Sequence, residues 1–261
     1  MSNVRNPAVA GLFYPDNPEK LRAMVAGYLA AAQAVNTVPK AIIAPHAGYV
    51  YSGPVAASAY ASIHPARGRI TRVLLLGPAH RVGFHGLALP GADYFMTPLG
   101  RIEIDQDAVK IISRLPQVQV MDVAHAQEHS LEVHLPFLQE VLGEFRLVPL
   151  VVGDAGADEV AEVLDLLWGG PETLVVISSD LSHYHDYQTA RKLDGATSRA
   201  IEQLQPEKIQ HDHACGRNPV NGLLQVAQRR GLKARTVDLR NSGDTAGRRD
   251  QVVGYGAYLF A

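Results

Sequence analysis

The sequence has a single cysteine, Cys215, among its 261 residues, and it has no excess of positive charge. One cysteine cannot form a disulfide within the chain, so Cys215 is either a small buried hydrophobic residue or a functional thiol. Lysine and arginine number 24 against 26 acidic residues, which leaves a formal net charge of -2. This balance gives no electrostatic reason to expect nucleic acid as a ligand, so a small molecule or a protein is the expected partner.

Long apolar runs and internal repeats are also missing. The chain begins Met-Ser-Asn-Val-Arg-Asn-Pro, without the apolar segment of a signal peptide, and no later segment is long and apolar enough to span a bilayer. We therefore expect a cytoplasmic protein with no membrane partner. No linker or low-complexity tract interrupts the sequence, so we expect a single domain over residues 1–261. Gly53 and Gly77 lack the spacing of a dinucleotide-binding motif, which disfavours NAD and nucleoside triphosphates.

What the chain does contain is an alternation of helical and strand patterns. Asn17 and Pro18 are typical of an N-cap and a first helical turn. The strand segments are apolar and β-branched, which indicates an α/β fold with a mostly parallel sheet covered by helices on both faces. Helices are predicted over residues 18–34, 54–60, 108–115, 131–142, 158–167, 188–204 and 219–230, and strands over residues 40–44, 72–76, 146–152, 174–177, 234–239 and 252–259.

Two histidines follow apolar strands in the same way. His46 comes after residues 42–45 (IIAP), and His80 comes after residues 74–78 (LLLGP). The loops that leave parallel strands meet at one edge of the sheet, so two imidazoles at equivalent strand ends favour a metal site over unrelated loop histidines. Imidazole suits iron, copper and zinc; the third ligand could be a carboxylate, as in non-haem iron triads, or a thiolate, which selects a softer ion.

Cys215 is a candidate for that thiolate. It lies three residues before Asn218 and Pro219, which we expect to begin the last helix. A thiol near a helix N-terminus has its thiolate form favoured by the helix dipole, which suits a metal ligand or a redox group. His211 and His213 flank Cys215 at intervals of two residues, and all three would share a face in a strand but not in a loop.

A third apolar strand, residues 174–178, is followed by Asp180 and His183. An Asp-x-x-His pair can place a carboxylate beside an imidazole, which sets the tautomer and makes the histidine a general base or a support for a metal ligand. The alternative is a helix cap beside a solvated histidine. His185 and Asp186 extend the cluster, although both could equally be surface residues.

Residues 125–129 (HAQEH) match the His-x-x-Glu-His pattern of inverted zincins. That pattern requires a helix, so that His125 and His129 share a face. The preceding residues 118–123 predict a strand or a turn, and we interpret the match as a coincidence. Glu128 and His129 are still expected to reach the common site, because the next predicted helix would hold them at its N-terminal end.

With these motifs in place, the whole chain resembles the MEMO family, also called protein B of the AmmeMemoRadiSam system. The resemblance implies the three-layer α/β/α core of the LigB-type extradiol dioxygenases and a pocket for one non-haem metal ion. The matching motifs, in order, are residues 10–15 (AGLFYP), 44–49 (APHAGY), 77–80 (GPAH), 128–136 (EHSLEVHLP), 178–183 (SSDLSH), 215–216 (CG) and 241–244 (NSGD).

The resemblance also implies which residues serve the pocket. His46, His80 and Cys215 match the metal ligands of the family, and Asp180 and His183 match residues that line the pocket. The dioxygenases hold iron with two histidines and a glutamate, so a thiolate at Cys215 changes the charge, softness and redox potential of the site. Catechol cleavage is therefore not expected. The family further implies a functional link to radical-SAM and AMMECR-type proteins.

Our leading hypothesis is a metal-dependent redox protein, a possible oxidoreductase, that binds one iron (Fe²⁺) or copper ion and uses dioxygen or a reduced oxygen species. In it, His183 or His129 moves protons, and Asp180 orients an imidazole.

Two other hypotheses remain. In one, the pocket recognises a peptide or a protein without turnover, since tyrosines in the pocket loops suit recognition as well as chemistry. These are Tyr49, Tyr51 and Tyr184. In the other, which we rank last, His125 and His129 hold zinc for hydrolysis.

Overall fold

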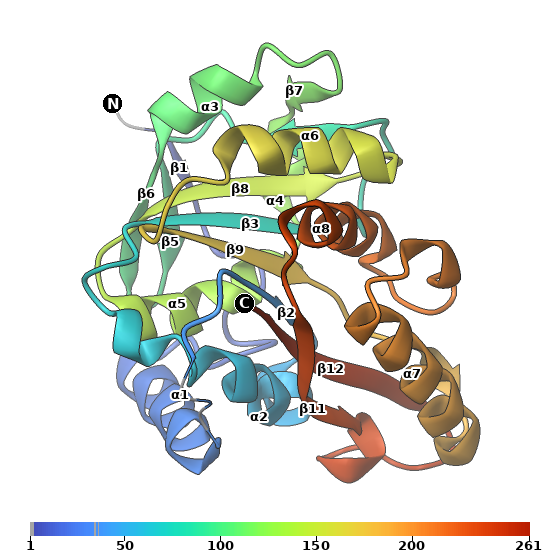
Figure 1. The fold of residues 1–261 in the computed structure, drawn as a ribbon. Coiled ribbons are helices and arrows are strands. Elements are labelled where there is room, and N and C mark those ends of the chain that lie inside the picture. The colour runs from blue at the N-terminus through green and yellow to red at the C-terminus, as the bar shows by residue number, and fades with distance from the viewer. Residues whose placement is uncertain (1–2, 34, 36) are drawn as a thin grey trace.

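A computed structural model describes residues 3–33, 35 and 37–261. Within these residues, twelve strands form one mixed sheet, in the order β1-β5-β6-β8-β3-β9-β2-β12-β10, with β11 on β12 and β4 between β7 and β8 (Figure 1). Their bounds are β1 Val4–Arg5, β2 Ala41–Ala44, β3 Arg72–Pro78, β4 Leu87–Leu89, β5 Tyr94–Thr97, β6 Gly100–Ile104, β7 Val118–Val120, β8 Arg146–Val152, β9 Thr173–Ser178, β10 His183–His185, β11 Ala234–Asn241 and β12 Val252–Phe260.

The centre of the sheet is parallel, as the sequence predicts. β6, β8, β3, β9 and β2 run side by side in one direction, and in this register Leu74 of β3 lies between Val148 of β8 and Val175 of β9. β12 runs antiparallel to β2, and both β10 and β11 run antiparallel to β12. Because the central strands are parallel, their carboxyl ends all lie at one edge of the sheet.

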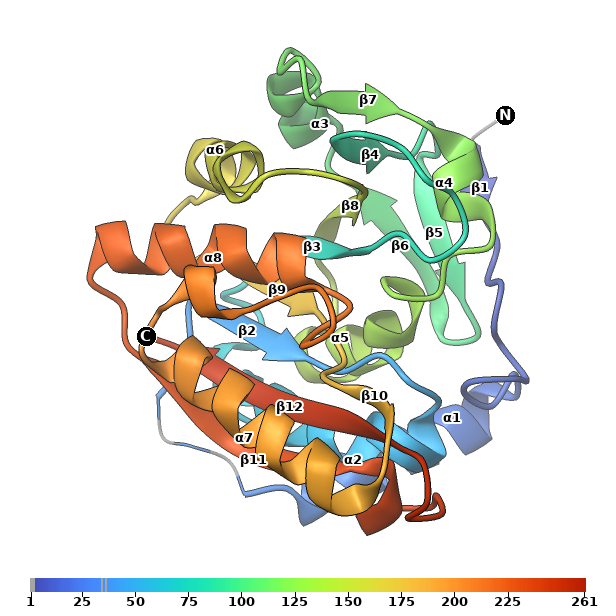
Figure 2. The ribbon, with the colours of Figure 1, turned by 90° about the vertical axis from the view of Figure 1, so that its right-hand side faces the viewer.

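Helices cover both faces of the sheet (Figures 1 and 2). α1, α2 and α5 pack on one face, and α3, α6, α7 and α8 pack on the other. Along β3, Val73 and Leu75 belong to the first core and Leu74 and Leu76 to the second, since successive side chains of a strand point to opposite faces. This confirms the three-layer α/β/α fold. The helices are α1 Pro18–Ala31, α2 Tyr49–Tyr60, α3 Gln106–Ile112, α4 Asp122–Ala126, α5 Leu135–Leu142, α6 Ala157–Leu167, α7 Tyr187–Glu202 and α8 Arg217–Arg230.

The helix starts show where tertiary contacts override local signals. Asn17 caps α1 as predicted, and its side chain accepts a hydrogen bond from the Lys20 amide at 3.0 Å. α2 begins at Tyr49 and not at Pro54, because the Tyr49 amide finds a partner in the carbonyl of Phe13 at 2.7 Å. α8 begins at Arg217, so Asn218 is not its cap; the Asn218 side chain donates instead to the Gly153 carbonyl at 2.9 Å.

The predicted helix over residues 131–142 divides in two, with a 3-10 turn at Glu132–His134 before α5. The Glu132 carboxylate is fully buried and forms an ion pair with Arg5. It also accepts hydrogen bonds from the amides of Ala8 (2.7 Å) and Val9 (3.0 Å) and from the Tyr14 hydroxyl (2.6 Å). These contacts anchor the N-terminal segment beside the carboxyl edge of the sheet, because a buried carboxylate needs such partners.

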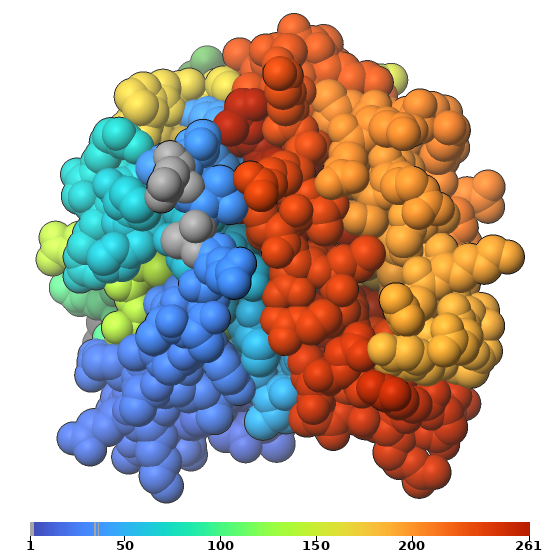
Figure 3. Space-filling model, turned by 60° about the horizontal axis from the view of Figure 1, so that its bottom comes forward, coloured from blue at the N-terminus to red at the C-terminus, as the bar shows by residue number. Residues whose placement is uncertain are grey.

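The first helices and the C-terminal strands lie next to each other on the face that Figure 3 shows. Across this junction, the Ser58 hydroxyl of α2 donates to the Asp238 carboxylate of β11 at 2.8 Å. β12 also inserts between β2 and β11. The two halves of the sequence are therefore joined within one sheet.

Candidate metal centre

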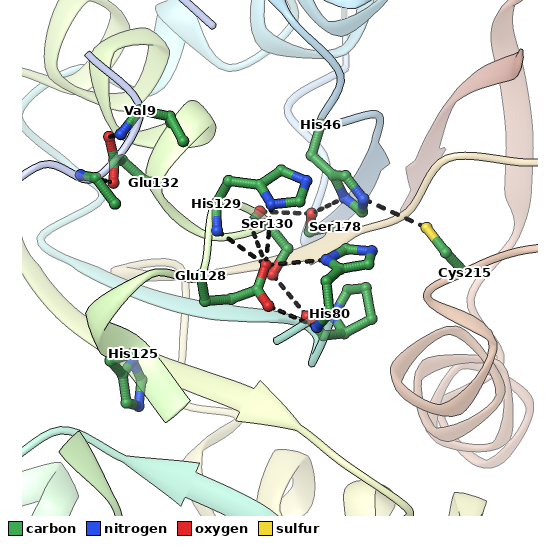
Figure 4. Close-up of polar contacts among 12 residues, drawn as sticks. Val9, His46, His80, His125, Glu128, His129, Ser130, Glu132, Ser178 and Cys215 are labelled. Atoms are coloured by element: carbon green, nitrogen blue, oxygen red, sulfur yellow. Dashed lines mark hydrogen bonds and ion pairs between the residues drawn. The ribbon is translucent and has the colours of Figure 1, made fainter. Parts of the chain in front are cut away.

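Three side chains from distant parts of the chain converge at the carboxyl edge of the sheet (Figure 4). His46 follows β2, His80 follows β3, and Cys215 lies two residues before α8. The Nε2 atom of His46 lies 3.3 Å from the Sγ atom of Cys215, and one ligand atom from each of the three residues lies within 4.8 Å of the others. His46 is buried, whereas His80 and Cys215 are partly exposed.

Ser178, the last residue of β9, sets the orientation of the His46 ring. Its hydroxyl donates to the Ser130 carbonyl at 2.6 Å and lies 2.5 Å from Nδ1 of His46. Because the hydroxyl has one proton and uses it toward Ser130, it accepts the proton of Nδ1. The lone pair of the ring is then on Nε2, which faces Cys215. Burial, together with the nearby histidines, lowers the pKa of His46 well below its usual value, so the ring is neutral.

Glu128 sets the orientation of the His80 ring. Its carboxylate lies 2.9 Å from Nδ1 of His80 and accepts hydrogen bonds from the backbone amides of His80 (2.6 Å), His129 (2.9 Å) and Ser130 (2.9 Å). Burial acts to raise the pKa of Glu128, but these hydrogen bonds and the His80 ring hold it at about 2. In the neutral ring the carboxylate accepts the Nδ1 proton and the lone pair lies on Nε2, an arrangement typical of metal-binding histidines.

The Cys215 thiol lies against the carboxyl end of β9. The Asp180 amide points at its sulfur from 3.3 Å. Burial, and secondarily the Asp180 carboxylate, raises the pKa of the thiol, so the free site holds a neutral SH group whose proton a bound cation would displace. Gly216 makes this approach possible, because a Cβ atom there would lie 2.4 Å from the Ser178 carbonyl oxygen. A glycine therefore follows Cys215 for a steric reason: no larger residue fits at position 216.

The predicted catalytic residues lie in the same pocket, which has a volume of about 560 Å³. The Asp180 carboxylate accepts the His46 backbone amide at 2.8 Å, and burial raises the pKa of Asp180 to about 6. The His129 ring contacts the rings of Phe13 (4.9 Å between centroids) and His80 (4.6 Å), and burial lowers its pKa to about 4. His183, half-buried on β10, lines the mouth.

The other histidines that the sequence analysis singled out, His211, His213 and His125, lie in different surroundings. His211 lines the pocket, whereas Nδ1 of His213 accepts a hydrogen bond from the Gln210 amide at 3.2 Å. His125 is buried, and its Nε2 lies 2.9 Å from the Ala88 carbonyl, apart from the cluster in Figure 4. α4 ends at Ala126, before Glu128 and His129. The His-x-x-Glu-His pattern therefore does not form the helix of an inverted zincin.

Sequence reasoning missed two contributors to the pocket. Ser178 belongs to a matched motif, but only the register of β9 against β2 brings its hydroxyl to His46. Phe13 also belongs to a matched motif, and nothing in its local sequence connects it with His129. The sequence feature that could have indicated Ser178 is a hydroxyl at the last position of an otherwise apolar strand.

The three donors fit a metal ion. Typical bonds of about 2.1 Å to imidazole nitrogen and about 2.3 Å to thiolate sulfur place tetrahedral ligand atoms about 3.5 Å apart. Both rings direct Nδ1 to a protein oxygen, which leaves Nε2 for a metal, and two imidazoles with one thiolate suit a borderline or soft transition metal. The fold and the site thus define an α/β protein with a candidate His-His-Cys metal pocket at the carboxyl edge of its sheet. Among the described residues, no helix is both long and apolar enough to cross a membrane.

Comparisons with known proteins identify the family of this chain. The profile of the family described as "Memo-like protein" matches residues 5–259, and the chain belongs to this family. It is 37% identical to a "MEMO1 family protein" of Aquifex aeolicus, over 98% of this chain and 99% of the relative. It is 35% identical to a "MEMO1 family protein" of Archaeoglobus fulgidus, over 98% of this chain and 99% of that relative. The crystal structure of uncharacterized protein JW3007 from Escherichia coli K12 shares the fold, with a TM-score of 0.50 and 12% identity, over 85% of this chain and 100% of that chain.

Proposed function

We propose that this protein binds one iron or copper ion through His46, His80 and Cys215 and acts as a metal-dependent redox protein that uses dioxygen or a reduced oxygen species. The observation that carries the proposal is the shared orientation of the two histidines. Each Nδ1 is tied to a protein oxygen, from Ser178 or Glu128, which leaves Nε2 as the nitrogen that can bind a metal. Either ion, when bound, would supply one-electron exchange that protein side chains cannot.

The side chains around the ligands support this function in separate ways. Asp180 holds the His46 backbone and lies next to the thiol. His129 presents a ring inside the pocket, and His183 stands where the pocket meets solvent, so these two are placed to move protons between the site and water.

Ring cleavage of the extradiol type is not part of the proposal. The carboxylate nearest to His80 is Glu128, and it is engaged with Nδ1 and with three backbone amides rather than free to serve as a third ligand. A thiolate in place of a carboxylate also lowers the hardness of the site and alters its redox potential.

Metal analysis of the purified protein tests the proposal. We expect about one equivalent of iron or copper in the wild type and a loss of binding in His46→Ala and in Cys215→Ser. The control is His64→Gln, an exposed histidine in a 3-10 turn outside the pocket, which should keep the metal. Equal retention by wild type and both ligand variants, or no iron or copper in any, rejects the metal site.

A second candidate is a binding module in which the same pocket recognises a peptide or a protein. The observation that favours it is Tyr184, which lines the pocket, is 72% exposed and has a φ of 62°. An exposed aromatic side chain held in a strained backbone is typical of recognition sites. Radical-SAM and AMMECR-type proteins, to which the family resemblance points, are the proposed partners.

Oxygen uptake in the presence of a reductant separates the two candidates. Metal-dependent consumption that is lost in His80→Ala supports the redox function. If the wild type with its full metal content consumes no oxygen above the level of His80→Ala, the binding module is the better account.

A further inference from the structure

A second cavity lies next to the metal pocket and shares part of its wall. Its volume is about 320 Å³, and it opens between the carboxyl ends of β3 and β8 and the start of α8. Cys215 and His211 line both this cavity and the metal pocket, so the thiol is part of the partition between them. Most of the other walls are apolar, from Pro78, Ala79, Val82, Phe84, Val152 and Pro219.

Backbone contacts hold these walls in place. The Ala79 amide donates to the Val152 carbonyl at 3.0 Å, and the Asp154 amide donates to the Phe84 carbonyl at 2.8 Å. A Cβ atom at Gly153 would lie 2.2 Å from that Phe84 oxygen, so the two segments pack as closely as glycine permits. The cavity is therefore preformed, as small-molecule sites usually are.

Arg217 gives the cavity a cationic side. It lines the cavity and is half-buried, and among the described residues its guanidinium has no ion-pair or side-chain hydrogen-bond partner. The one carboxylate in the lining, Asp154, is 77% exposed and lies 3.4 Å from Nδ1 of His85. A guanidinium beside apolar walls suits an organic anion, since its fork of N–H donors matches a carboxylate.

We propose that this cavity binds a small organic anion, with an apolar body against Val82 and Phe84 and a carboxylate at Arg217, and that the bound molecule contacts the sulfur of Cys215. The cavity volume lies at the lower end of the usual range for small-molecule sites, about 300 to 1,000 Å³, which favours a molecule about the size of a single ring. If Cys215 binds the metal, the organic anion would lie beside the sulfur ligand of that metal. This consequence rests on the proposed function.

The first test is a ¹H–¹⁵N NMR titration of the metal-free protein with benzoate, with benzyl alcohol as its neutral analogue. Benzoate should shift the amides of residues 79–84, 152–154 and 211–218. Arg217→Gln should weaken benzoate binding about five- to tenfold and leave benzyl alcohol unaffected. The matched control is Arg81→Gln, an exposed arginine that lines neither cavity. Val82→Trp should abolish the binding of both molecules by filling the cavity.

The second test measures the contact with Cys215. In the Co²⁺-substituted protein, saturating benzoate should shift the thiolate-to-metal charge-transfer band, and it should do so in Arg81→Gln but not in Val82→Trp. No shifts in the named amides, or equal benzoate affinity in Arg217→Gln and Arg81→Gln, would overturn the anion site. An unmoved band would overturn the contact with sulfur. Failure to bind Co²⁺ would count against the proposed metal function alone, because the first test needs no metal.

Discussion

The Nε2 atom of His46 lies 3.3 Å from the Sγ atom of Cys215, although 169 positions separate the two residues in the chain. His46 follows β2, a strand of the sheet. Cys215 lies in the loop before α8, a helix on the face opposite to α1, α2 and α5. The last residue of β9, Ser178, contacts His46, and the amide of Asp180, two residues beyond the strand, points at the sulfur of Cys215. Several predictions concern the groups that maintain this geometry.

Ser178→Ala should weaken metal binding without unfolding the protein. The variant loses the acceptor of the His46 Nδ1 proton, so the ring no longer favours the tautomer with a free Nε2. Loss of such a supporting contact typically lowers metal affinity about 10- to 100-fold. Competition with a chromophoric chelator measures the affinity. Ser178→Thr, which keeps a hydroxyl, should restore part of it, and Ser62→Ala, at another fully buried serine, should have no effect. Wild-type affinity in Ser178→Ala would contradict the assigned role.

Glu128→Gln should weaken metal binding by a similar factor, about 10- to 100-fold, because the ionised carboxylate orients His80. It should also lower the free energy of unfolding by about 1–3 kcal/mol, since an amide cannot accept all the hydrogen bonds that now converge on the carboxylate. Glu140→Gln is the control, because the Glu140 carboxylate forms a surface ion pair with Arg22 at 3.1 Å. Chelator competition and urea unfolding measure the two effects, and equal results for both variants would count against the support of His80.

Gly216→Ala should destabilise the fold and displace Cys215. The new Cβ atom would lie 2.4 Å from a backbone oxygen of Ser178 and 2.7 Å from Cβ of Ser179, and neither belongs to a flexible side-chain end. Overpacking of this kind costs about 1–3 kcal/mol. Gly27→Ala, in α1 with nothing within 4 Å of the new Cβ, should instead be neutral or stabilising. Denaturant unfolding compares the two, and an unchanged midpoint for Gly216→Ala would refute the steric argument.

The protein should lose stability as the pH falls below about 6.5, the usual pKa of histidine. Burial lowers the pKa of His134 to about 3 and that of His125 to about 4. Between these values and 6.5 the unfolded chain binds more protons than the folded one, so stability rises with pH, at most by about 1.4 kcal/mol per pH unit for each histidine.

A pH series of urea unfolding curves tests this titration. His134→Gln should reduce the slope of unfolding free energy between pH values of about 4 and 6, whereas His64→Gln, at an exposed position, should not. The same slope in wild type and His134→Gln would show that another group causes the acid sensitivity. The comparison uses slopes, so any loss of the contact between His134 and Tyr60 does not affect it.

Much of the site followed from strand ends in the sequence. His46, His80 and Asp180 each come after an apolar run, and parallel strands carry such residues to one edge. Cys215 was a candidate thiol from its place before the last helix, and the family resemblance made it the third metal ligand. The α/β class, the helix cap at Asn17 and the parallel centre of the sheet followed from local patterns of the same kind.

Other features depend on contacts between distant segments. The start of α2 at Tyr49 depends on Phe13, and the position of α8 places Asn218 on Gly153 rather than at a helix cap. The contacts of the His129 ring with Phe13, which is tilted against it, and with His80, which stacks on it, likewise join three separate segments. No pattern within one element predicts these contacts, because each depends on how the elements pack.

The sequence by itself determined the type of fold and the residues able to bind a metal, because hydrophobic periodicity and residue chemistry are local properties. Only the tertiary structure decided which nitrogen of each histidine can bind a metal, since Ser178 and Glu128 reach the rings from other elements. It also decided that Cys215 borders two cavities, because their walls come from strand ends and a helix start that meet only in the folded chain.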